Sequence, residues 1–174
     1  ALSFWSGLPE TRASLVIGRD GVVDCWNTLL VERLISAMLI PAPNERYRAV
    51  NALVDWTTSS LQPTPGNMGG LKPDGSVFHH GGHYPAYAIG GFEGLTAFLT
   101  ALSGSGFSIS ENAFAQLSKA ITAMKRYTNA YEWTIGVSGR HPHQGSMTEK
   151  LYNRALQLGL LSTQEPQGFF VMNH

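Results

Sequence analysis

Apolar residues recur at helical spacing along most of this chain. From Trp26 to Ile40 they return every three or four positions, which places them on one face of a helix. Pro41 and Pro43 are expected to end this helix, and Asn44 to cap the next one. The same pattern predicts further helices over residues 45–61, 84–102, about 110–128 and 146–160, with Ser108 or Ser110 as the cap of the helix that ends near residue 128.

The predicted helices are joined by polar connections, so that helix, loop and helix recur along the chain. This order favours an all-α fold of stacked antiparallel helical hairpins, in which long loops at one rim build the site. We assign residues 1–165 to this helical domain. The apolar end, within residues 166–174, is interpreted as a strand cut short. Because the chain also begins without Met, we expect it to be a fragment of a longer protein.

Composition excludes several classes of protein. The chain has 174 residues, of which 43% are hydrophobic, and a formal net charge of zero. These values indicate a globular domain, and a neutral balance argues against nucleic acid as a partner, because phosphate binding needs a basic excess. The longest apolar runs are too short to span a membrane. The single cysteine, Cys25, excludes an internal disulfide framework.

One short segment concentrates the candidate chemistry. It follows a turn that begins at Pro73, in which proline presets φ and Gly75 accepts a positive φ. We therefore place the segment on a loop that leads into the helix over 84–102, where functional groups often lie. Imidazole and phenol groups at this density indicate proton transfer or metal binding. The residues concerned are His79, His80, His83, Tyr84 and Tyr87.

Other charged and imidazole groups give weaker signals. His141 and His143 could join the histidine segment as zinc ligands, but no His-Glu-x-x-His motif and no cysteine partner supports a zinc site. Lys125 and Arg126 are expected on a solvated helix face. Glu93 is expected on a helix surface or in a satisfied polar contact.

The segment His80-Gly-Gly-His-Tyr-Pro-Ala-Tyr87, followed 53 residues later by Arg140 in Gly139-Arg-His-Pro142, resembles the polysaccharide lyases of family eight. Within that family it is most similar to the broad-specificity chondroitin sulfate ABC lyases. Supporting strings are Ser3-Phe-Trp-Ser-Gly-Leu-Pro9, Asp24-Cys-Trp-Asn27, Leu61-Gln-Pro-Thr-Pro65 and Gly69-Gly-Leu-Lys-Pro-Asp-Gly75. The resemblance implies that the helical domain is the late part of an α/α toroid, and that residues 166–174 are the truncated start of a β-sandwich domain that follows it.

The resemblance also implies a lyase that breaks chondroitin or dermatan sulfate by β-elimination. A proton leaves C5 of the uronic acid and the glycosidic oxygen leaves C4, which requires a neutralised carboxylate, a base and an acid. Tyr87 is implied as base and acid for glucuronate, with Arg140 as the cation that stabilises its phenolate and holds the substrate. His80 is implied to bind the carboxylate, or to act as base for iduronate, whose C5 proton points to the opposite face.

Three neighbouring residues have two interpretations each. His79 is either a plain loop residue or a second donor or base for the opposite epimer. Asp24 and Asn27 flank a helix start and either cap it or belong to the site. In the second case Asp24 orients His79, with a calcium or magnesium ion as an optional third member, and Asn27 lies near the carboxylate.

Aromatic residues complete the set of candidates. Trp26 and Trp5 either stack on sugar rings or pack in the core. Tyr84 is assigned to substrate binding. The family also uses a glutamate from the β region, which this chain lacks, so we expect the isolated chain to be nearly inactive. The resemblance further implies that no cofactor is required.

Two hypotheses from different classes stay open. The first is a catalytic fragment of a glycosaminoglycan lyase, and the second is a non-catalytic helical domain that binds carbohydrate or serves as a scaffold. The partners implied are an acidic sulfated polysaccharide and the remaining domains of the parent chain, without nucleic acid or membrane. The resemblance further implies a secreted or periplasmic bacterial protein.

Overall fold

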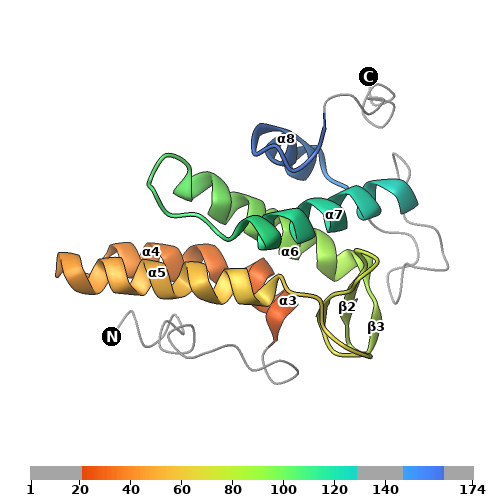
Figure 1. Ribbon diagram of the computed structural model, residues 1–174, viewed down its shortest axis with the longest axis horizontal. Coiled ribbons are helices and arrows are strands. Elements are labelled where there is room, and N and C mark those ends of the chain that lie inside the picture. Colours follow the sequence, from red (N-terminus) through yellow and green to blue (C-terminus); the bar gives the residue numbers. More distant parts are fainter. Residues whose placement is uncertain (1–20, 129–146, 163–174) are drawn as a thin grey trace.

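The computed structural model describes residues 21–128 and 147–162, and within them helices predominate (Figure 1). The prediction of an all-α fold is confirmed, with the addition of one small sheet. Arg140, Trp5, His141, His143 and the predicted strand over 166–174 lie outside the described residues. No helix among the described residues combines the length and apolar character that crossing a membrane requires.

The first predicted helix is interrupted by a π-helical turn. A short α3 (Val22–Asp24) continues into the π-helix η1 (Cys25–Leu29) and then into α4 (Leu30–Met38). Spacing alone predicts a regular helix here, and the extra residue that a π turn inserts was missed. Such turns occur often at functional sites. Within this segment, η1 packs most extensively on the later helix α6 (Pro85–Leu102).

The second helix begins earlier than predicted. α5 runs over Pro43–Ser60, its N-cap is Ala42, and no side chain caps it. The prediction that Asn44 is the cap is therefore wrong. The physical reason is Pro43, whose fixed φ suits the first turn of a helix and whose missing N–H costs nothing there. α4 and α5 are joined by a short turn and lie side by side (Figure 1).

A small antiparallel sheet replaces part of the predicted loop. Its strands are β1 (Gly70–Leu71), β2 (Val77–His79) and β3 (Gly82–His83), in that order. Gly70 pairs with Phe78 and Phe78 with His83, so β2 is the central strand. The sheet matters because two of the candidate histidines lie on it rather than on an irregular loop.

The central helix is α6 (Pro85–Leu102), which packs on α3, η1, α4, α8 and β2. Two glycines bring η1 unusually close to it. A Cβ atom added at Gly94 would lie 1.8 Å from the backbone oxygen of Trp26, and one at Gly91 would lie 3.2 Å from the Trp26 ring. The backbones therefore approach each other directly, which fixes the position of η1 against the middle of α6.

Two further helices complete the described fold. α7 (Glu111–Tyr127) is capped by Ser110, whose side chain accepts a hydrogen bond from the Ala113 amide, so the second of the two predicted caps is the correct one. α8 covers Glu149–Gln157, within the helix predicted over 146–160. The largest fully buried side chains of the common core are Trp26, Phe92 and Phe98.

Two polar residues of this region have contacts of their own. Lys125 is buried, with its ammonium 5.6 Å from the centre of the Tyr152 ring, so the prediction of a solvated position is wrong. Its long aliphatic stem allows it to pack between α7 and α8 while its charge lies over an aromatic face. The Glu93 carboxylate accepts a hydrogen bond of 2.5 Å from the Thr148 hydroxyl, one of the two predicted outcomes for this residue.

Candidate active site

The tip of the β2–β3 hairpin carries His80 in a left-handed conformation. His79 pairs with Gly82, so the turn between the strands consists of His80 and Gly81, with φ of 51° and 83°. Positive φ at both central residues is the signature of a type I′ turn, which suits the twist of a two-residue hairpin. His80 is the one described non-glycine residue with positive φ. At the tip of the hairpin it is exposed to solvent.

Four aromatic rings gather where this hairpin meets the start of α6. The His79 ring lies 4.1 Å from the His80 ring and 4.2 Å from the Tyr87 ring, measured between centroids. The Tyr87 ring lies 5.3 Å from His80, edge-on, and 4.7 Å from Tyr84. The structure thus brings together the four predicted residues of this segment, which we call the ring cluster: His79, His80, Tyr84 and Tyr87.

Local hydrogen bonds connect the hairpin to the helix that carries Tyr87. The Tyr84 amide donates to the Val77 oxygen at 3.0 Å, and the Tyr87 amide donates to the Tyr84 oxygen at 3.2 Å. Pro85 takes the first position of α6, where its missing N–H is harmless. Tyr84 is only 5% exposed whereas Tyr87 is half-buried. The burial of Tyr84 favours a supporting role beside Tyr87 over direct contact with a substrate.

Asp24 approaches the ring cluster from the other side. Its carboxylate oxygen lies 3.5 Å from the His79 Nε2 atom, an ion-pair distance that is longer than an ordinary hydrogen bond. About half of the Asp24 side chain is exposed, and it makes no capping hydrogen bond. Of its two predicted interpretations, the geometry supports the pair with His79 rather than the helix cap. A carboxylate at this position can orient the imidazole ring.

Trp26 and Asn27 behave in opposite ways. Trp26 is fully buried, and its indole N–H donates to the Ser60 hydroxyl at 2.8 Å. Stacking of Trp26 on a sugar ring is therefore contradicted, and core packing is its role, because no face of the ring reaches solvent. Asn27 is exposed instead, and its amide lies against the backbone of α6 at Gly90.

A buried lysine holds the loop behind the hairpin. Lys72 is 6% exposed, and its ammonium donates to the Met68 oxygen at 2.6 Å and to the Thr64 hydroxyl at 2.9 Å. The same ammonium lies 4.7 Å from the centre of the Phe78 ring, next to His79 in the chain. Burial lowers the pKa of Lys72, and the nearby Asp74 carboxylate opposes that change. The sequence pattern indicates no role for Lys72, because nothing in its spacing distinguishes it from a surface lysine.

His83 belongs to a separate environment on the far side of the hairpin. Its ring contacts the Tyr127 ring edge-on at 5.0 Å, and its Nε2 atom has no hydrogen-bond partner among the described residues. Burial lowers the pKa of His83, against an opposing contribution from Asp74. Burial also raises the pKa of Tyr127 far above that of an ordinary phenol. His83 is thus biased toward its neutral form and lies apart from the ring cluster.

The described residues offer only a partial fit to a divalent cation. Among them, no three or more histidine, cysteine or acidic side chains gather at one point. Asp24 and His79 supply a single carboxylate and an imidazole, whereas calcium takes six to eight oxygen ligands and magnesium an octahedron of them. This pair alone therefore does not complete a calcium or magnesium site.

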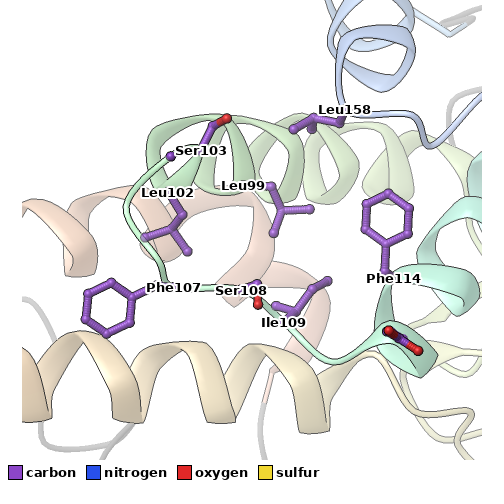
Figure 2. Close-up of a pocket in the computed structure, with 10 residues that line it drawn as sticks. Leu99, Leu102, Ser103, Phe107, Ser108, Ile109, Phe114 and Leu158 are labelled. Carbon is purple, nitrogen blue, oxygen red and sulfur yellow. The ribbon is translucent and has the colours of Figure 1, made fainter.

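A separate pocket lies at the opposite end of α6. It has a volume of about 460 Å³ and is lined mainly by apolar side chains, among them Leu99, Phe107 and Phe114 (Figure 2). Polar residues such as Glu111 also line this pocket, but no histidine or tyrosine is among its lining residues. Proton-transfer chemistry therefore points to the ring cluster and not to this pocket.

Comparison with known proteins identifies the class to which this arrangement belongs. Residues 1–165 match the family described as "Lyase, catalytic", and the chain is therefore a member of that lyase family. The resemblance to polysaccharide lyases inferred from the histidine and tyrosine motif is confirmed.

Curated relatives specify the relationship further. The chain is 38% identical to a chondroitin sulfate ABC exolyase of Proteus vulgaris over 123 residues, or 71% of this chain. It is 32% identical to the exolyase of the same name from Bacteroides thetaiotaomicron over 69% of the chain. It is also 33% identical to a chondroitin sulfate ABC endolyase of Proteus vulgaris, again over 69%. Each match spans 12% of the relative's own length.

Proposed function

We propose that this chain forms part of the catalytic domain of a glycosaminoglycan lyase that cleaves chondroitin and dermatan sulfate by β-elimination. The observation that carries the proposal is the contact between the ring of His80, at the tip of the hairpin, and the ring of Tyr87, at the start of α6. The chain that contains this contact belongs to a lyase family. The relatives are named for chondroitin sulfate, which agrees with a polyanionic substrate. An extracellular or periplasmic location is part of the same proposal.

Tyr87 performs the proton transfers in this mechanism. Its phenolate takes the proton from C5 of a glucuronate, the electrons of the C5–H bond form a C4–C5 double bond, and the C4–O bond breaks. The departing glycosidic oxygen then receives a proton from the phenol, so that protons and electrons balance. His80, exposed beside Tyr87, binds the carboxylate, or acts as the base when the C5 proton of iduronate faces it. Arg140 is proposed as the cation that stabilises the phenolate.

The surrounding residues bind and orient the substrate. Asp24 holds the His79 ring against Tyr87, so His79 can serve the iduronate epimer. The exposed Asn27 amide offers hydrogen bonds to the uronate carboxylate. A divalent cation at Asp24 and His79 remains a prediction, for which substrate or residues outside the described part would have to supply further oxygen ligands.

Replacement of Tyr87 by phenylalanine in the full-length protein tests the proposal. This change keeps the ring contacts and removes only the oxygen that transfers protons. We expect kcat to fall by at least about 10²–10⁴-fold, the usual contribution of general acid–base catalysis, while KM stays nearly constant. The rate is measured from the ultraviolet absorbance of the unsaturated uronate product.

The matched control is Tyr47→Phe, which removes a phenol from α5 where the Tyr47 ring contacts only Phe107 among the described rings. It should leave the rate unchanged. Wild-type rates in Tyr87→Phe would contradict the mechanism. A wild-type protein that binds chondroitin sulfate without releasing unsaturated product would instead support a non-catalytic carbohydrate-binding domain.

A further inference from the structure

We propose that Gly90 is a positioning residue of this site: its missing side chain leaves the notch in α6 in which the Asn27 amide rests. The proposal deepens the function proposed above, because it explains how an exposed asparagine on one helix is held at a defined place beside Tyr87 on another. Asn27 is then the group that contacts the substrate, and Gly90 is the group that places it.

The Asn27 amide lies unusually close to the Gly90 backbone. A Cβ atom added at Gly90 would lie 2.5 Å from the Asn27 Oδ1 atom, 2.6 Å from Cγ and 2.8 Å from Nδ2. Real Cβ atoms essentially never make contacts this short, and the three distances cover the whole amide group. The Asn27 amide thus occupies the space that any other residue at position 90 would fill. Van der Waals contact with the helix backbone fixes its plane.

Hydrogen bonding supplies the second observation. Asn27 is exposed, and among the described residues its side chain makes no hydrogen bond to the protein. An amide carries two donors and one acceptor oxygen, and burial against Gly90 covers only one face of it. The donors therefore remain available to an anionic group such as a uronate carboxylate, and contact with α6 takes the place of a protein hydrogen bond in setting the orientation.

Helical register supplies the third observation. Asp24 lies beside His79, whose ring contacts Tyr87, and Asn27 lies beside Gly90. Gly90 is three residues after Tyr87 in α6, so these two residues are about one helical turn apart. Residues at this spacing share a helix face, about 5–6 Å apart between Cβ atoms. The Asn27 amide is therefore one turn along from the Tyr87 stem, on the face that carries the ring cluster.

The other glycines of this face have a different function. At Gly94 the obstacle to a side chain is the backbone oxygen of Trp26, and at Gly91 it is the buried Trp26 ring. These glycines set the distance between the helices. At Gly90, in contrast, the nearest atoms are the end of an exposed side chain, which can move aside without disturbing the core. A change at Gly90 should therefore alter the site and leave the fold intact.

The experiment compares Gly90→Ala, Asn27→Ala and the double variant in the full-length protein. We expect each single variant to lose about 10- to 100-fold in kcat/KM, the effect of a lost hydrogen bond to a charged group. The double variant should be no worse than Asn27→Ala, because both changes remove the same contact. The pH profile should keep its shape, since neither residue titrates, and the thermal midpoint of Gly90→Ala should not fall. A crystal structure of Gly90→Ala should show the Asn27 amide displaced.

The outcomes separate the two proposals. A full loss in Asn27→Ala with wild-type activity in Gly90→Ala would overturn the role of Gly90. That role is also overturned if Gly90→Ala reduces activity further in the Asn27→Ala background, or if both variants are fully active while Tyr87→Phe is inactive. If the wild-type protein releases no unsaturated product, the proposed function fails. Independently of activity, an Asn27 amide that keeps its position in the Gly90→Ala crystal structure would contradict the proposal that Gly90 leaves space for this amide.

Discussion

The His80 ring meets the Tyr87 ring edge-on, with centroids 5.3 Å apart and ring planes at 88°. Both residues belong to one short stretch of the chain, and two local structures bring their rings together. A type I′ turn places His80 at the tip of the hairpin, and the first turn of α6 carries Tyr87. The contact is therefore built entirely from a short, continuous segment, and it does not depend on the arrangement of distant parts of the protein.

The left-handed conformation of His80 leads to a first prediction. A side chain with a Cβ atom pays roughly 1–2 kcal/mol for this conformation, whereas asparagine adopts it more readily. His80→Asn should therefore keep or raise the free energy of unfolding, by up to about 1 kcal/mol, while lyase activity falls sharply. Thermal unfolding and product absorbance measure the two effects. A clear loss of stability would show that the contacts of the His80 ring outweigh the backbone strain.

The pair between Asp24 and His79 leads to a second prediction, about the epimers of uronic acid. If this pair serves iduronate, His79→Ala should slow cleavage of dermatan sulfate more than cleavage of chondroitin 4-sulfate. Asp24→Asn should shift the ratio of the two rates in the same direction by a smaller amount. The His79 ring is still present in this variant, but the Asp24 carboxylate that orients it has lost its charge. Equal losses on both substrates would remove the epimer-specific role, and no loss on either would leave His79 as a structural residue.

His83 leads to a third prediction, about stability and pH. Burial lowers its pKa in the folded protein below the ordinary value of 6.5. Between the folded pKa and that value the unfolded chain binds more protons, so stability rises with pH across this window and is lost as the pH falls below about 6.5. The groups facing His83 are Asp74 from the turn and Tyr127 from α7. His83→Gln should flatten this dependence in unfolding experiments, whereas an unchanged slope would assign it to other groups.

The sequence predicted the helical part of this structure well, because apolar residues repeat at helical spacing in every main helix. It also placed His79, His80, Tyr84 and Tyr87 close together, since they are neighbours in the chain. The roles of these residues in catalysis remain predictions. The small sheet was missed, although Gly81 and Gly82 after His80 are a recognisable turn signal once Val77 and Phe78 are read as a strand.

Contacts between distant segments could not be predicted from the sequence. Nothing in the spacing shows that Lys72 folds back onto Thr64 and Met68, or that the Trp26 indole reaches Ser60. The pairing of Asp24 with His79 was one of two open interpretations, and only three-dimensional placement favours it. The π turn of η1 likewise depends on packing against α6, because no residue type within it demands an extra residue per turn.

The last prediction concerns Gly94 and the stability of the fold. A methyl group at position 94 would lie 1.8 Å from the backbone oxygen of Trp26, and no side-chain movement can relieve that contact. Gly94→Ala should therefore push η1 away from α6 and lower the free energy of unfolding by about 1–3 kcal/mol or more, the range for overpacked cores. Denaturant-induced unfolding measures the change. Gly90→Ala is the matched control, since it adds the same methyl group to the same helix and meets only the movable end of Asn27. That control should be as stable as the wild type, because alanine is also the better helix former. Equal stability of the two variants would mean that the backbones of α6 and η1 do not touch at Gly94.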